Sequence, residues 1–245
     1  MKPLFSSRRI LAAGCVGVAA LTWLAVAQIS PLAHVSEAMA MDAPATHRPS
    51  AGPPGTIHAH VCGFHFYSGE PQRALRVEHY CAHLSSGVMQ CTIYDSDRPE
   101  ARLIGVEYII GEAMFMALPA EEKRLWHSHR YEVMSGLLTA PDADAAGEEA
   151  LMKELVNTYG KTWHLWQVDR GDVVPLGLPK LMMGFTADGQ VDPALVAARD
   201  RAAGVDSAVT KARRADFPVR PIAEGADSGA GARAFQLSDA VLSRP

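Results

Sequence analysis

Two short β-rich segments joined by a turn most constrain how this chain can fold. In residues 77–84, alternation of side-chain direction along a strand would place His79, Cys81 and His83 on one face. The turn-forming residues 85–87 follow, and a second run of β-branched and aromatic residues comes directly after them. The pattern predicts an antiparallel hairpin with a short glycine-containing loop.

The loop length sets the register of this hairpin. If residues 85–87 form the loop, Leu84 pairs with Val88 and Cys81 lies directly opposite Cys91. Opposed strand residues have Cβ atoms roughly 4.5–5.5 Å apart, and native disulfides prefer about 3.5–4.5 Å. We therefore predict a Cys81–Cys91 disulfide.

The rest of the folded region alternates further strands with a few helices. Strands are expected at residues 57–67, 102–110, 127–138, 162–168 and 181–186, and helices at residues 119–126, 148–159 and 192–203. Gly160 is well placed to end the second helix, and Asp192 with Pro193 to begin the third. These elements predict an α+β fold: a single domain with a mostly antiparallel sheet and three or four flanking helices.

The N-terminal segment has the pattern of a targeting sequence. Basic residues precede an uncharged apolar run at residues 10–27, and a small-residue A-x-A site follows at residues 38–40. Residues 1–40 are therefore predicted to be an export signal or an uncleaved N-terminal membrane anchor. The protein is expected to be exported, and so periplasmic or secreted.

Composition places the remaining boundaries. Residues 41–56 are rich in Pro, Ala and Gly without periodicity, which predicts a flexible linker. A single domain over residues 57–237 and a tail over residues 238–245 complete the chain. The formal net charge is −4 and no block of Lys or Arg occurs, so nucleic acid is not expected as a partner.

Histidines suggest a metal site. Eight of them lie between residues 58 and 164, and the H-x-H spacing of His127 and His129 would place both imidazoles on one face of a strand. The third ligand would be His164 or one of His79 and His83, since four residue rises separate the last two by roughly 13 Å. The cofactor that such ligands would hold is a divalent metal such as zinc.

Two alternatives to a metal site stay open. The histidines could be structural and hydrogen-bond to carboxylates such as Glu78, Asp95 or Glu107. Cys62 with a nearby histidine could form a nucleophilic thiolate pair, although no G-x-S-x-G motif, P-loop or dinucleotide fingerprint occurs.

Several long segments carry a resemblance to a known family. They are residues 79–84, 90–95, 103–110, 125–129, 159–164 and 221–227. In these segments the chain resembles the oil-body-associated protein family, known as DUF1264, over about residues 58–237. Plant members associate with the surface of seed lipid droplets. The N-terminal segment and linker depart from the plant pattern, so this location is not carried over.

The resemblance implies a function class and no catalytic residues. It favours a non-enzymatic binding protein that acts on a lipid or another apolar surface, to which the methionine-rich residues 181–185 would be suited. The alternative is a metal-dependent enzyme that uses the histidine cluster. Metal analysis and co-sedimentation with liposomes would distinguish the two.

Overall fold

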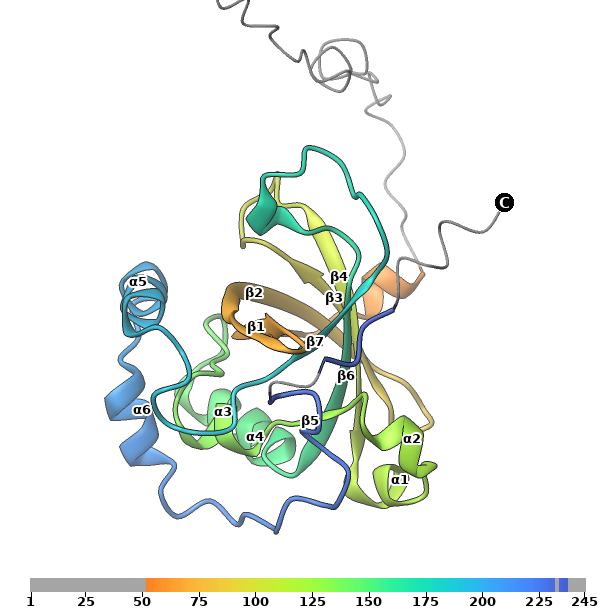
Figure 1. Ribbon diagram of the computed structural model, residues 1–245. Helices are drawn as coiled ribbons and strands as arrows, with labels where there is room; N and C mark the ends of the chain where they lie inside the picture. Colours follow the sequence, from red (N-terminus) through yellow and green to blue (C-terminus); the bar gives the residue numbers. More distant parts are fainter. Residues whose placement is uncertain (1–51, 232–233, 238–245) are drawn as a thin grey trace, which may run out of the picture. The chain divides into compact units, whose positions relative to one another are not determined.

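The computed structural model describes residues 52–231 and 234–237, which form a closed, six-stranded antiparallel β-barrel (Figure 1). Its strands are β1 (Ala59–Tyr67), β2 (Glu70–His83), β3 (Met89–Tyr94), β4 (Leu103–Gly111), β6 (Thr158–His164) and β7 (Lys180–Met183). They are ordered β4-β3-β2-β1-β7-β6, and β6 pairs with β4 to close the ring. The two-residue strand β5 (His127–Ser128) also pairs with β6, next to the residues that pair with β7.

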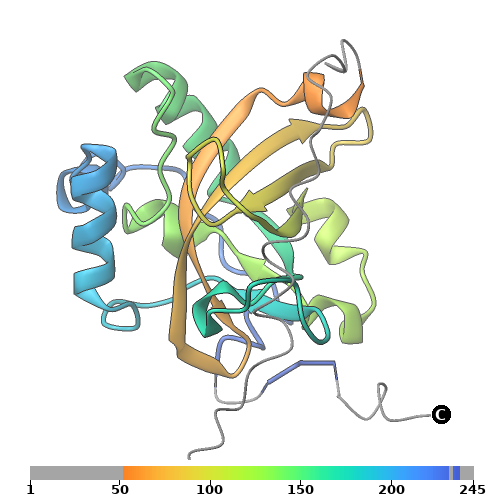
Figure 2. The same ribbon diagram turned by 90° about the horizontal axis from the view of Figure 1, so that it is seen from above.

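The prediction of an α+β fold, with a sheet flanked by three or four helices, is wrong. The barrel closes through pairing of β4 with β6, which are far apart in the sequence, and strand periodicity does not reveal such a partner. Within the described residues the helices are short and surround the barrel (Figure 2). They are α1 (Glu112–Met116), α2 (Ala120–Lys123), α3 (Arg130–Met134), α4 (Ala145–Leu155), α5 (Pro193–Ala203), α6 (Ser207–Arg213) and the 3₁₀ helices η1 (Pro53–Thr56) and η2 (Val168–Arg170).

The hairpin of β2 and β3 has the predicted register. Leu84 N–H donates to the carbonyl of Val88 at 2.8 Å, and Gly87 has a positive φ of 82° that suits glycine in this turn. Cys81 pairs with Cys91 across the strands, and a disulfide joins them.

Inward positions along the strands divide the barrel interior into layers. On β2, Val77 belongs to one apolar cluster and Cys81 to another, and His79 lies between them. On β4, Glu107 occupies the same place between Ile104 and Ile109. A polar layer therefore crosses the barrel between two apolar clusters.

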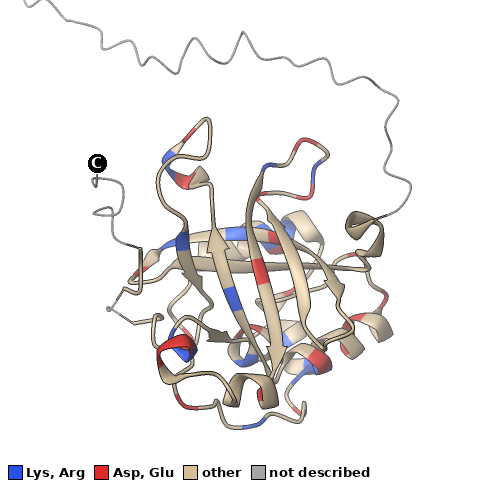
Figure 3. Ribbon diagram, turned by 90° about the vertical axis from the view of Figure 1, so that its right-hand side faces the viewer, with Lys and Arg blue, Asp and Glu red and all other residues tan. Residues whose placement is uncertain are grey.

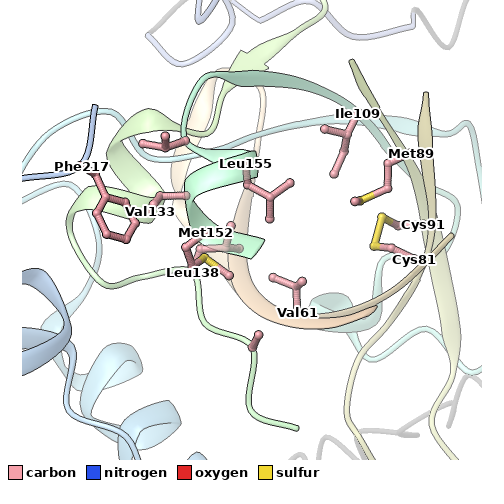
Figure 4. Packing of buried hydrophobic residues seen from close by; sticks show 12 residues of the cluster. Val61, Cys81, Met89, Cys91, Ile109, Val133, Leu138, Met152, Leu155 and Phe217 are labelled. Atoms are coloured by element: carbon pink, nitrogen blue, oxygen red, sulfur yellow. A yellow bond between two sulfur atoms is a disulfide. The ribbon is translucent and has the colours of Figure 1, made fainter. Parts of the chain in front are cut away.

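The larger apolar cluster fills one end of the barrel. Figure 4 shows Leu155 of α4 on the side that faces Met89 and the disulfide, and Met152 of the same helix beside Leu138. Met89, Met152 and Leu155 are at most 3% exposed. This plug separates the polar layer from solvent at that end.

Two local predictions are wrong, and both concern the polar layer. The strand expected over residues 127–138 is only β5, because His129 has helical dihedrals and α3 begins directly after it. The helix expected to end at Gly160 ends at Leu155, and Gly160 lies in β6 opposite Ile109. By contrast, α5 begins at Pro193 with Asp192 as its N-cap, as predicted.

Other predicted segments are only partly described. Residues 1–40, most of the predicted linker and residues 238–245 lie outside the described residues. Over the described residues, Lys and Arg are interspersed with Asp and Glu (Figure 3).

Candidate metal centre inside the barrel

The polar layer contains five histidines and two glutamates, contributed by four barrel strands, β5 and α3. All seven are buried, with at most 4% of each residue exposed. They are His65 of β1, His79 of β2, Glu107 of β4, His127 of β5, His129 and Glu132 at the start of α3, and His164 of β6. Because burial of so many polar groups is costly, the layer needs strong internal partners.

Glu107 lies at the centre of the layer, and each carboxylate oxygen faces a different pair of imidazoles. Oε1 lies 3.1 Å from His129 Nε2 and 3.4 Å from His127 Nε2. Oε2 lies 3.0 Å from His79 Nε2 and 3.9 Å from His65 Nε2. Four Nε2 atoms thus converge on one carboxylate.

The other ring nitrogen of His129 determines which nitrogen carries its proton. The hydroxyl of Thr158 donates to the carbonyl of Leu155 at 2.7 Å and accepts from His129 Nδ1 at 2.8 Å. In neutral His129, Nε2 is therefore a lone-pair acceptor. It faces the acceptor oxygen of Glu107, an arrangement that requires a cation or a proton between the two atoms.

His127 and Glu132 are the least satisfied members of the layer. Neither ring nitrogen of His127 has a hydrogen-bond partner, since the 3.4 Å approach to Glu107 does not have hydrogen-bond geometry. Oε2 of Glu132 also has none, and it lies 3.8 Å from His127 Nε2. Buried polar atoms without a protein partner are rare, so these atoms are available to bind a ligand.

Glycines make room for the two carboxylates. A Cβ at Gly160 would lie 2.0 Å from Glu107 Oε1, and a Cβ at Gly184 would lie 2.4 Å from Glu132 Oε2. Any other residue would displace these carboxylates.

The electrostatics leave most of the imidazoles neutral. Burial holds the pKa of His65 well below its usual value, lowers the pKa of His129, and lowers the pKa of His164 to about 3. Burial would also lower the pKa of His127, but the nearby Glu107 carboxylate outweighs it and raises that pKa. Neutral imidazoles are the form that binds metals.

The two glutamates differ in charge. Burial would raise the pKa of Glu107, but the surrounding imidazoles outweigh it and hold that pKa well below its usual range. Burial raises the pKa of Glu132 to about 8. Glu107 is therefore the charged carboxylate, and Glu132 would lose its proton on binding a cation.

A cavity of about 20 Å³ adjoins the carboxylate of Glu107. Its polar wall includes His79, His129 and Glu132, and its apolar wall includes Met89 and Leu155. A cavity of this size has room for about one water molecule.

The layer contains four of the five predicted metal ligands. His127, His129 and His79 face Glu107, and His164 Nε2 lies 3.3 Å from His65 Nδ1. His83 lies outside the layer, where it contacts His58 and Glu154 at the surface. Both histidines of the H-x-H pair lie in the polar layer, although His129 is not in a strand.

The predicted ligand set left out three members of the layer, although Glu107 was named as a carboxylate with which the histidines could pair. His65 is on the same strand face as Val61, so its alternation held a signal. Glu107 stands within a nearly apolar strand, which is itself a signal of a buried functional carboxylate. No sequence pattern indicated that Glu132 lies near the histidines, because the segment around it was predicted to be a strand.

Comparison with known proteins identifies the family. The model of "Protein of unknown function (DUF1264)" matches residues 51–218. The chain belongs to this family. Oil body-associated protein 1B of Arabidopsis thaliana is 39% identical over 194 residues, which cover 77% of this chain and 80% of that protein. Oil body-associated protein 1A of Zea mays is 42% identical over 182 residues, which cover 72% and 76%. No solved structure gives a significant match to the chain.

These relatives correct the predicted location. The similar plant proteins of the DUF1264 family are named for oil bodies, which are neither periplasmic nor secreted, so the prediction of a periplasmic or secreted location is wrong. The residues on which that prediction relied lie outside the described part of the chain. Among the described helices, none has the length and apolar character needed to cross a membrane.

Proposed function

We propose that this protein binds a divalent transition metal, zinc in the first instance, inside its barrel. The ligands are His127 Nε2, His129 Nε2, Glu132 Oε2 and Glu107 Oε1. The observation that carries the proposal is the Nε2 lone pair of His129, which faces the Glu107 carboxylate at 3.1 Å while Nδ1 is committed to Thr158.

The spacing of these atoms suits a tetrahedral ion. Zinc binds nitrogen and oxygen at about 2.0–2.2 Å, so the ligand atoms of a tetrahedral site are about 3.3–3.6 Å apart. The three measured separations are 3.1, 3.4 and 3.8 Å. The ligand atoms of His127, His129 and Glu132 also lie within 4.8 Å of one another. Only small side-chain shifts are needed.

The competing possibility is a network held together by protons alone. A protonated His127 would balance the charge of Glu107, but the lowered pKa of His129 disfavours a second proton there. Oε2 of Glu132 would also stay unpartnered. A metal ion removes both difficulties, because it attracts the His129 lone pair and the Glu132 oxygen together.

Elemental analysis tests the proposal. Wild-type protein from zinc-supplemented medium, purified without chelator, should contain at least one stoichiometric metal ion. His129→Asn and Glu132→Gln should each lose an ion while they retain the wild-type circular dichroism spectrum. The matched control is His83→Asn, which changes a surface histidine and should retain full metal content. Metal-free wild type would mean that the proton network is correct.

A second candidate function, association with a lipid surface, is supported by the names of the relatives and by an outer groove. Two adjacent hollows of about 300 and 220 Å³ share Ile57, Tyr80 and Thr92 on the outside of the barrel. Tyr108 beside them is 46% exposed. Co-flotation with phospholipid-coated triacylglycerol droplets tests this function. Tyr108→Glu should reduce binding and His83→Asn should not; absence of wild-type protein from the floating layer would rule it out.

A further inference from the structure

The second oxygen of Glu107 points to an additional metal ion. We propose that His65 Nε2, His79 Nε2 and Glu107 Oε2 bind a second divalent transition metal, so that Glu107 bridges two ions. This inference rests on the proposed function of the first site and extends it from a single ion to a dinuclear centre.

The three atoms have the spacing of ligands on one ion. His79 Nε2 lies 3.0 Å from Glu107 Oε2 and 3.3 Å from His65 Nε2, and His65 Nε2 lies 3.9 Å from the same oxygen. These distances bracket the roughly 3.3–3.6 Å expected between ligands of a tetrahedral site. All three residues are at most 3% exposed, so bulk water does not separate them.

Hydrogen bonding independently shows that His79 directs a lone pair at Glu107. The backbone carbonyl of Val61 lies 3.1 Å from His79 Nδ1 and can only accept, so Nδ1 carries the proton. In neutral His79, Nε2 is then an acceptor, which can receive a hydrogen bond from His65 Nε2 at 3.3 Å but also faces the acceptor oxygen of Glu107 at 3.0 Å. The contact with Glu107 repels unless a cation or a proton lies between the two atoms. A carbonyl that fixes the outer nitrogen in this way is the usual support of a metal-binding histidine.

His65 is oriented by a second histidine. Its Nδ1 lies 3.3 Å from His164 Nε2, which leaves Nε2 directed toward His79 and Glu107. His164 therefore acts as a positioning residue for the second ion.

One carboxylate between two ions is a recurrent arrangement. In two-metal sites the ions are about 3.5–4 Å apart and share bridging ligands. The two histidines that face each oxygen of Glu107 come from different elements. Those at Oε1 belong to β5 and the start of α3, and those at Oε2 belong to β1 and β2. The adjoining cavity of about 20 Å³ has room for one solvent molecule, the size of a hydroxide that would bridge both ions.

Metal stoichiometry in single variants tests the dinuclear centre. Wild type from zinc-supplemented medium should contain two ions per chain. His79→Asn should retain one, and Glu132→Gln should also retain one, because each variant damages a different site. His83→Asn should retain both, and circular dichroism should show that every variant is folded.

The outcomes separate this inference from the first proposal. One ion in wild type, lost in Glu132→Gln and retained in His79→Asn, would leave the first site standing and overturn the second. One ion lost in both variants would mean a single ion shared by all the histidines, which also overturns the second site. Metal-free wild type would overturn both proposals.

Manganese provides a second readout. In protein produced with Mn²⁺ in the medium, two bridged ions should give the electron paramagnetic resonance spectrum of a coupled pair. His79→Asn should give the spectrum of isolated Mn²⁺. An isolated-ion spectrum in fully loaded wild type would contradict a bridging Glu107.

Discussion

Gly160 of β6 lies directly against the carboxylate of Glu107, with space for that carboxylate only because residue 160 has no side chain. A Cβ there would meet Oε1 at 2.0 Å and the Nε2 atoms of His129 and His127 at 2.8 and 2.9 Å. Gly160→Ala should therefore displace Glu107 and weaken zinc binding about 10–100-fold, the usual effect of disturbing the support of a metal ligand.

The measurement for Gly160→Ala is zinc affinity by competition with a chromogenic chelator, read only after incubation long enough that the distribution of zinc no longer changes. Gly111→Ala is the matched control, since nothing lies within 4 Å of a Cβ at that position. The control should bind zinc like wild type. Equal affinity in all three proteins would show that Glu107 does not depend on the space at Gly160.

The Cys81–Cys91 disulfide should contribute measurably to stability. It links residues that are ten apart in the sequence, and the chain-entropy model gives roughly 2–3 kcal/mol for a loop of this size. Urea unfolding of Cys81→Ser/Cys91→Ser should show this loss. Reductant should destabilise wild type by a similar amount and leave the double variant unchanged. A wild type insensitive to reductant would contradict the prediction.

His60 should make stability depend on pH. It contacts Glu78 at 3.0 Å and Asp142 at 2.8 Å; burial alone would lower its pKa, but these carboxylates outweigh burial and raise that pKa above 6.5. Because the folded pKa is raised, the stabilisation is complete below about pH 6.5 and is lost as pH rises through the folded pKa.

Urea unfolding at several pH values measures this contribution. His60→Asn should be less stable than wild type by about 1–2 kcal/mol at pH 6, toward the low end for hydrogen bonds to charged groups because Asp142 is exposed to solvent, and the difference should shrink toward pH 9. The exposed His58→Asn is the control. A difference that stayed constant from pH 6 to pH 9 would mean that His60 acts through packing on Tyr80 instead.

Arg199 should be essential for attaching α5 to the barrel. This buried side chain donates to the carbonyls of Leu137 and Gly136 at 2.6 and 3.0 Å and pairs with Asp200 at 2.8 Å. Arg199→Met would leave these acceptors unsatisfied and should lower the free energy of unfolding by roughly 3 kcal/mol. Thermal and urea unfolding are the measurements. The exposed Arg201→Met of the same helix should change stability little; equal effects would rule out this role.

Local features of the fold could be predicted because they depend on neighbouring residues. The β2–β3 register follows from the turn at residues 85–87, and the start of α5 follows from Asp192 and Pro193. Barrel closure could not be predicted, because pairing of β4 with β6 depends on the whole chain. Gly160 could not be placed correctly for the same reason. Its place in the sequence suits the end of a helix, and the need for a glycine within β6 becomes clear only from the Glu107 carboxylate packed against it.

The candidate site could be predicted in part for related reasons. H-x-H spacing is local, so His127 and His129 could be identified. Their carboxylate partners are Glu107 of β4 and Glu132 of α3, and only the three-dimensional pairing of the strands brings Glu107 to both histidines. The separation of His79 from His83 along one strand predicted that only one of the two could join the site, and only His79 lies in the polar layer.

The position of the polar layer between two apolar clusters also governs how fast an ion could enter or leave. No ligand of the layer is more than 4% exposed, so exchange would require the barrel to open locally, a rare event in a packed core. An ion enclosed while the chain folds would then be released slowly even when a tighter-binding competitor is present. The identity of the metal in the purified protein would consequently depend on the ions available in the cell during synthesis and not on those in the purification buffer.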